Sequence, residues 1–169
     1  MNILETLLSG DGGIAKQLAG QFGIDPEQAT SAIGALVPAL AGGMKEKLES
    51  GAGGGLLEML TSGALNQFAE NPAALSSPAA MQQGQSLLNS IFGGGNLGGI
   101  VSMVAEKAGI SGGVIEKMLP VVTAVLGGML AKNVGNDPAE LTNMLGTLAA
   151  GGEGGLLGAV KGLAAKIFG

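Results

Sequence analysis

The stretch VIEKMLPVVTAVLGGMLAK, residues 114–132, decides the fold class of this 169-residue chain. Its apolar residues recur every three or four positions and cover a wide arc of a helix. They are Val114, Ile115, Met118, Leu119, Val122, Val125, Leu126, Met129 and Leu130. An arc of this width predicts a core helix that other helices surround. Pro120 lies inside the stretch and removes one backbone hydrogen bond, so we expect the helix to kink or to start afresh there.

A similar pattern occurs earlier in the chain, which indicates an internal repeat. Ile14–Ala19 matches Ile100–Ala105 at an offset of 86 residues. After a slip of one residue, Gly42–Met44 matches Gly127–Met129 at an offset of 85. Because Gly, Ala and Leu are so frequent here, single matches carry little weight, but a run of matches at a nearly constant offset favours a duplicated helical unit.

The two halves also end alike, on Ile-Phe-Gly at residues 91–93 and 167–169. Val and Ile are few, and no segment shows a clear strand pattern. The predicted fold is therefore all-α, a compact multi-helix bundle of two tandem, pseudo-symmetric Gly/Ala-rich helical repeats. We expect residues 1–93 to form the first repeat and residues 94–169 the second, within one compact unit.

Small residues follow the proline of each central helix. The candidate packing residues are Pro38, Ala39 and Gly43 in the first half, and Pro120, Ala124 and Gly128 in the second. Small residues four positions apart on a helix let another backbone approach closely. We therefore predict that the two central helices cross at these pairs, on a pseudo-two-fold axis.

Helix starts and stops are marked by local chemistry. A capping side chain followed by proline is the usual N-terminal signal, and it occurs at Asp25-Pro26, Asn71-Pro72, Ser77-Pro78 and Asp137-Pro138, while Ser111 can cap a further helix. Gly-rich runs predict helix ends, at Gly51–Gly55, Gly93–Gly95 and Gly151–Gly155.

Composition excludes most site chemistry. The chain has no His, Cys, Trp, Tyr or Arg, which removes the common general bases, thiol nucleophiles and zinc ligands. Eight Lys against 13 acidic residues give a net charge of −5, and only four Phe are present, so no nucleic-acid surface is expected. We expect no enzyme activity, no catalytic residue, no metal site and no cofactor.

One motif matches a known site pattern. Residues 93–98 satisfy the dinucleotide fingerprint G-x-G-x-x-G, yet about one such match is expected by chance in a chain this rich in Gly. The fingerprint also requires a preceding strand, whereas residues 86–92 are predicted to be helical.

The C-terminal segment, residues 155–169, carries the clearest interaction pattern. On a helical projection its apolar residues share one arc, with a lysine on either side. The candidate interaction residues are Leu156, Leu157, Val160, Lys161, Leu163, Lys166, Ile167 and Phe168, with Ala164 inside the arc. Such a helix either docks on a protein core or lies on a membrane surface. The shared Ile-Phe-Gly ending favours docking.

The residues quoted above resemble a bacterial family. Residues 14–44, with Gly23-Ile24, Pro38 and Gly42-Gly43, resemble the first block of the YidB-like proteins (domain of unknown function 937). Residues 101–132 resemble the second block. The resemblance implies an all-helical fold and a bacterial source. It supplies no catalytic residues.

These observations favour a non-enzymatic helical interaction or structural module that self-associates or binds another protein. One alternative is membrane-surface association through the C-terminal helix. Another is an apolar-ligand-binding protein whose cavity is lined by Met44, Met59, Met103, Met118, Met129 and Met144. The longest runs without strongly polar residues are about a dozen residues, short of the ~20 that span a membrane. With no evident signal peptide, the expected location is the bacterial cytoplasm.

Overall fold

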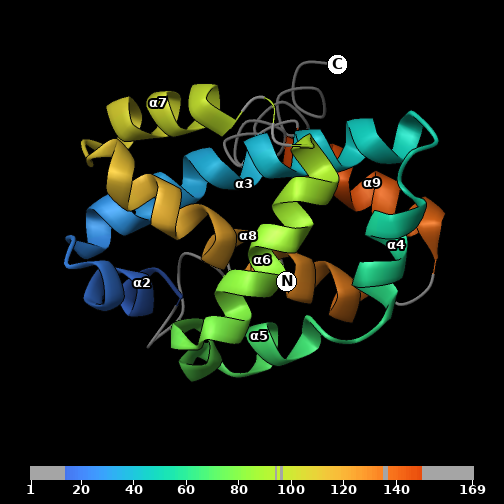
Figure 1. The fold of residues 1–169 in the computed structure, drawn as a ribbon, viewed down its shortest axis with the longest axis horizontal. Helices are drawn as coiled ribbons and strands as arrows, with labels where there is room; N and C mark the ends of the chain where they lie inside the picture. The colour runs from blue at the N-terminus through green and yellow to red at the C-terminus, as the bar shows by residue number, and fades with distance from the viewer. Residues whose placement is uncertain (1–13, 94, 96, 135–136, 150–169) are drawn as a thin grey trace, which may run out of the picture.

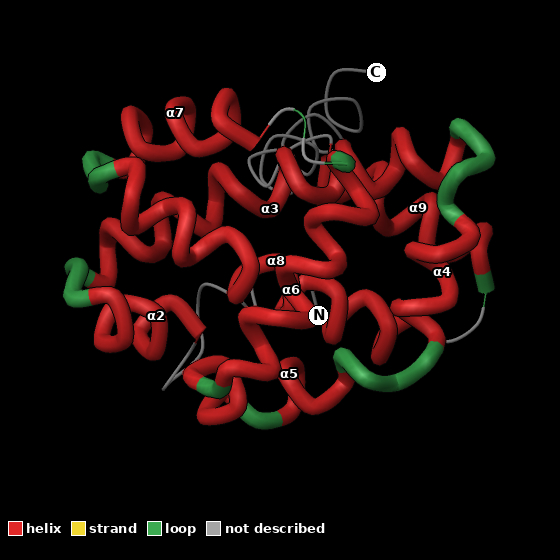
Figure 2. The backbone as a smooth tube through the Cα atoms, in the orientation of Figure 1, coloured by secondary structure: helices red, strands yellow, loops and turns green. Residues whose placement is uncertain are grey.

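The computed structural model describes residues 14–149, apart from residues 94, 96 and 135–136. All regular elements in this part of the chain are helices (Figures 1 and 2). In chain order they are α2 (Ile14–Phe22), α3 (Pro26–Glu49), α4 (Gly54–Thr61), α5 (Asn66–Glu70), the 3₁₀ helix η1 (Pro72–Ser76), α6 (Pro78–Phe92), α7 (Leu97–Ala108), α8 (Gly112–Val134) and α9 (Pro138–Ala149). The prediction of an all-α fold is confirmed for the described residues.

Capping side chains begin the helices where the sequence predicts them. α6 follows Ser77, whose Oγ accepts a hydrogen bond from the Ala80 N–H at 3.4 Å. α9 follows Asp137, whose Oδ1 accepts from the Ala139 N–H at 2.9 Å. Asn71 caps in the same way, but the helix that follows it is the short 3₁₀ helix η1. Each cap satisfies a backbone donor that has no partner within its own helix.

α2 and α7 end in the same kind of turn. Gly23 and Gly109 both have φ of +66°, a conformation that other residues adopt only with strain. The next N–H bonds back to the carbonyl five residues earlier, from Ile24 to Ala19 at 3.0 Å and from Ile110 to Ala105 at 3.1 Å. This is the hydrogen bond that closes a Schellman helix ending. It turns the chain from each short helix into the long helix that follows.

α8 forms the centre of the hydrophobic core. Every residue from Met118 to Leu130 is buried, as the wide apolar arc predicts. Helices α3, α5, α6 and α7 all pack against it (Figure 1). Thr123 is fully buried, and its Oγ1 donates to the carbonyl of Leu119 at 2.6 Å, so its hydroxyl has a partner. Pro120 lies within one continuous helix, as does Pro38 in α3.

The main helix contacts join the two predicted repeats. α6 packs on α8, and α3 packs on both α7 and α9, so residues 1–93 and the described part of residues 94–169 share one core. The Gln28 side chain adds a polar tie between them, because its Nε2 donates to the carbonyl of Gly109 at 3.1 Å. The pseudo-two-fold relation between the repeats stays a prediction.

α8 has the length and composition of a membrane span. Among the described helices it is the one that meets both criteria by itself, over Gly112–Lys132. Its longest run without strongly polar residues, 118–131, is shorter than the ~20 residues that span a membrane. In this fold 78% of its apolar window is buried by the rest of the protein. A core helix has this same property, and the packing accounts for the apolar sequence of α8.

Candidate functional site

α6 crosses α8 at unusually close range. Gly84 of α6 lies against the backbone of Pro120 in α8, so close that a Cβ at position 84 would overlap the Pro120 carbonyl oxygen. Leu87 and Leu88, just beyond the crossing, are buried in the core. The crossing sets the path of α6 relative to α8. Pro120, Gln85 and Leu88 near the crossing also border a space between α6, α7 and α8.

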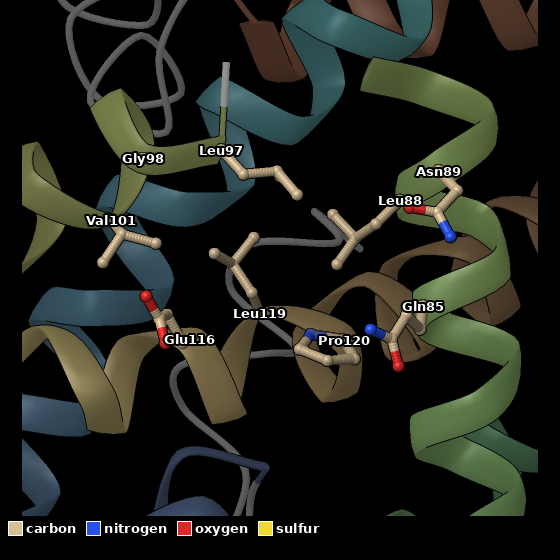
Figure 3. A pocket seen from close by; sticks show the side chains of 9 residues that line it. All are labelled: Gln85, Leu88, Asn89, Leu97, Gly98, Val101, Glu116, Leu119 and Pro120. Atoms are coloured by element: carbon tan, nitrogen blue, oxygen red, sulfur yellow. The ribbon is translucent and has the colours of Figure 1, made fainter. Parts of the chain in front are cut away.

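That space is a pocket of about 270 Å³ between α6, α7 and α8 (Figure 3). Leu88, Leu97 and Leu119, one from each helix, point toward one another across it. The complete lining is Gln85, Leu88 and Asn89 from α6, Leu97, Gly98 and Val101 from α7, and Glu116, Leu119 and Pro120 from α8. A core that packed without gaps would fill this volume with its own side chains. The three helices therefore leave room for apolar groups from elsewhere.

The polar groups of the pocket lie at its edge. Gln85, Asn89 and Glu116 are exposed, whereas Leu88 and Leu119 are buried. Glu116 is the single ionisable residue among the nine that line the space, so the pocket has an apolar floor and one acidic edge. Its volume falls just below the ~300–1,000 Å³ typical of small-molecule sites. It suits a few apolar side chains better than a large ligand.

An exposed methionine lies on α6 near the pocket. Met81 of α6 is 38% exposed. It lies one and two helical turns before Gln85 and Asn89, so the three residues share one side of the helix. Met103 of α7 is 41% exposed, but it is two positions from the lining residue Val101 and faces another direction. Met81 is thus a single exposed apolar side chain on the side of α6 that carries Gln85 and Asn89.

The predicted packing residues Gly43 and Gly128 are both sites of close helix contact, and their nearest neighbours belong to helices other than α8 and α3. A Cβ on Gly43 would lie 2.6 Å from the ring of Phe92 and 2.8 Å from Ile91 Cγ2, so Gly43 packs against the end of α6. A Cβ on Gly128 would overlap the carbonyl oxygen of Leu65, where α5 begins. The closest neighbours of the two glycines thus belong to α6 and α5.

The other predicted packing residues divide between core and surface. Ala124 is fully buried within α8, and Pro120 is buried while also forming part of the pocket floor. Pro38 and Ala39 of α3 are half-buried. Of the six predicted packing residues, Pro120 is the one that lines the pocket.

The six methionines proposed to line an apolar cavity are dispersed. Met44 and Met118 are fully buried in the core, and Met103 is exposed. None of the six lines the pocket between α6, α7 and α8. The predicted interaction residues of the C-terminal segment, Leu156 to Phe168, lie outside the described residues.

The described part of the chain contains no cluster of potential metal ligands. Among its residues, no three His, Cys, Asp or Glu side chains are grouped as ligands for a metal ion. The two ion pairs found there are solvent-exposed, Lys45 with Glu49 at 3.7 Å and Lys132 with Glu70 at 3.4 Å. Gly93 of the G-x-G-x-x-G match directly follows helix α6, so the strand required before a dinucleotide loop is replaced by a helix.

Comparison with protein families now places the chain. The model of the family described as "Bacterial protein of unknown function (DUF937)" matches residues 5–133, which is most of the sequence. The chain belongs to the DUF937 family. The match confirms the resemblance drawn from the sequence, and it spans α2 to α8, including every residue that lines the pocket. Searches of curated proteins and of solved structures give no match.

Proposed function

We propose that this DUF937 protein is a non-enzymatic helical interaction module that self-associates by accepting an apolar segment of a second copy in the α6–α7–α8 pocket. The observation that supports the proposal is the pocket itself, in which Leu88, Leu97 and Leu119 converge on a space of about 270 Å³. An apolar space left open at the surface of a tightly packed helical core is a common feature of protein interaction sites.

The energetics favour an apolar partner. Burial of apolar surface contributes about 25 cal/mol per Å² removed from water. A helix that inserts two or three leucine-sized side chains therefore gains several kcal/mol, part of which offsets the entropy lost on association. Glu116 at the edge adds selectivity, because it favours a partner with a cationic side chain beside its apolar residues.

The composition supports the non-enzymatic part of the proposal. A chain without His, Cys, Tyr or Arg lacks the side chains that most often act as acid, base or nucleophile. The pocket contains a single carboxylate, at Glu116, whereas most glycosidases and the aspartic proteases use a pair.

Light scattering over a dilution series tests the proposal. We expect the full chain to change from monomer to dimer between ~1 µM and ~1 mM, the range in which a segment on a short linker exchanges between copies. A chain that stays monomeric at every concentration contradicts self-association. Native mass spectrometry of the same sample detects a retained apolar ligand, which would support the ligand-binding alternative instead.

A further inference from the structure

The pocket has a candidate occupant in the chain itself. We propose that the segment Gly155–Gly169 fills the α6–α7–α8 pocket as an amphipathic helix, from its own chain at low concentration and from a second copy at high concentration. The inference rests on the proposed function, and it names the segment that enters the pocket. The segment lies outside the described residues, which end at Ala149.

The described chain ends against α3, beside the residue of α3 that precedes its contact with α6. A Cβ on Gly42 of α3 would lie 3.9 Å from the Cβ of Ala149, the last residue of α9. The next residue of α3, Gly43, contacts Ile91 and Phe92 at the end of α6. Ala149 and the end of α6 thus contact successive residues of α3, and Ile91 in that end of α6 is about one helical turn from Leu88 in the pocket wall.

The remaining chain is long enough to reach and fill the site. Residues 150–154, AGGEG, can extend over at most ~16 Å. Residues 155–169 would form a helix ~22 Å long. A linker of this length can pass from Ala149 around α3 toward the end of α6, and a helix of this length can lie across the mouth of the pocket.

The segment complements the pocket in both polarity and charge. On a helical projection, Leu156, Val160 and Leu163 lie together in the apolar arc, which suits the leucine-lined floor. Lys161 and Lys166 flank that arc and can reach the carboxylate of Glu116 at the pocket edge. Gly158 and Gly162 lie on the opposite face, where the helix would meet solvent.

The last three residues of the segment, Ile-Phe-Gly, also occur at the end of α6, where their packing is described. α6 ends on Ile91-Phe92-Gly93, the same three residues that end the segment at 167–169. In α6 the Ile91 side chain is buried, and Phe92 packs against Gly43 of α3. The ending that the two segments share thus belongs, where it is described, to a helix docked on the core.

Which copy supplies the segment determines the oligomeric state. A short linker gives the segment an effective concentration near its own pocket of about 1 mM, so a dilute chain fills its own site. A short linker also favours exchange of the same segment between copies at high protein concentration. Self-association then appears as protein concentration approaches the effective concentration.

Engineered disulfides in the full chain test the inference, because the natural sequence has no cysteine. Gly98→Cys places one thiol in the pocket, and Leu157→Cys, Val160→Cys or Ala164→Cys places the other along the apolar arc. Gly99→Cys and Ala165→Cys are the matched controls, since each neighbours a test position but points elsewhere. A disulfide forms only where the two Cα atoms approach within about 7 Å.

We expect at least one arc position to form a disulfide with Gly98→Cys about tenfold faster than with Gly99→Cys. We expect Ala165→Cys to form no disulfide with Gly98→Cys at a comparable rate. Intrachain product in dilute protein and interchain product in concentrated protein both support the inference. If no arc position reacts preferentially with Gly98→Cys, the inference is overturned, even when light scattering detects dimers. A strictly monomeric chain with intrachain disulfides overturns self-association alone.

Vesicles containing phosphatidylcholine and phosphatidylglycerol separate docking from membrane binding. We expect the full chain to stay in the supernatant when the vesicles are sedimented. Co-sedimentation of the full chain, combined with loss of the Gly98→Cys disulfides in the presence of vesicles, overturns the inference in favour of a membrane-bound segment.

Discussion

Gly84 of α6 packs directly on the carbonyl of Pro120 in α8, and this contact holds the two helices at backbone distance. The proline cannot donate a hydrogen bond, and the glycine has no side chain to separate the helices. Leu88 and Leu119 converge in the pocket, and they lie four residues after Gly84 and one residue before Pro120. The contact thus joins the stability of the core to the geometry of the candidate site.

Substitution of Gly84 tests this contact. Gly84→Ala should lower the free energy of unfolding by about 3 kcal/mol, because the new methyl group meets backbone atoms that cannot move without shifting a helix. Gly34→Ala in α3 is the control, since a Cβ there has no neighbour within 4 Å. It should stabilise the protein by about 0.5–1 kcal/mol through helix propensity. Equal denaturation midpoints for the two variants would refute the close crossing.

Adjacent glycines in α8 should differ in the same way. Gly128→Leu should cost about 3 kcal/mol by overpacking, because position 128 faces the Leu65 carbonyl at the start of α5. Gly127→Ala should cost about 1 kcal/mol, since its nearest neighbours are the side-chain ends of Leu65 and Leu87, each 2.8 Å from the new Cβ, and not backbone atoms. Urea unfolding of both variants measures the difference. A near-unchanged midpoint for Gly128→Leu would show that α5 does not hold this position.

Gln28 joins two helix ends, and its loss should be measurable. Its Oε1 accepts from the Asp25 N–H at 3.2 Å, and its Nε2 donates to the Gly109 carbonyl at 3.1 Å. Gln28→Ala removes both bonds and should cost about 1–1.5 kcal/mol. Gln28→Glu keeps the acceptor of the capping box and should lose less than half of that. Thermal unfolding that ranks Glu at or below Ala would count against the capping role.

The turn at Gly109 should tolerate few replacements. Gly109→Ala should cost about 1–2 kcal/mol, because φ is +66° and an alanine Cβ is strained there. Gly109→Asn should cost less, since Asn adopts this conformation more readily. No other atom lies within 4 Å of a Cβ at this position, so the difference reports backbone strain alone. Equal losses for the two variants would contradict that interpretation.

Local features of the fold could be predicted from the sequence because their causes are local. The cap at Ser77, the helix end at Gly93 and the buried arc of α8 each depend on residues within one or two helical turns. Asn71-Pro72 gave the right start but a 3₁₀ helix, since only five residues follow before the next cap at Ser77.

The neighbours of the small residues could not be predicted in this way. Small side chains at Gly43 and Gly128 indicate that something approaches closely, but carry no information on which helix does so. The chain fills these places with Phe92 and with the start of α5. The match between the two repeats suggested a mutual crossing instead.

The pocket was missed for a related reason. Leu88, Leu97 and Leu119 each belong to an ordinary apolar helix pattern, and nothing in that pattern shows that three helices leave a gap between them. The gap depends on the crossing of Gly84 over Pro120 and on the turn that returns α7 to α8. Exposed Gly98 at the pocket edge is a local sign of the pocket, since glycine inside a helix lowers its stability unless close packing requires it.

The central claim is that the pocket is the site of self-association, and a pair of variants tests it most directly. Gly98→Phe fills the pocket from its edge, while Gly99→Phe places the same side chain one position away, and a Cβ at either position has no neighbour within 4 Å. Static light scattering across the dilution series should give wild type and Gly99→Phe a mass that rises from 16.4 kDa toward twice that value. Gly98→Phe should stay at the monomer mass throughout. Dimerisation of Gly98→Phe at the wild-type concentration would contradict the account.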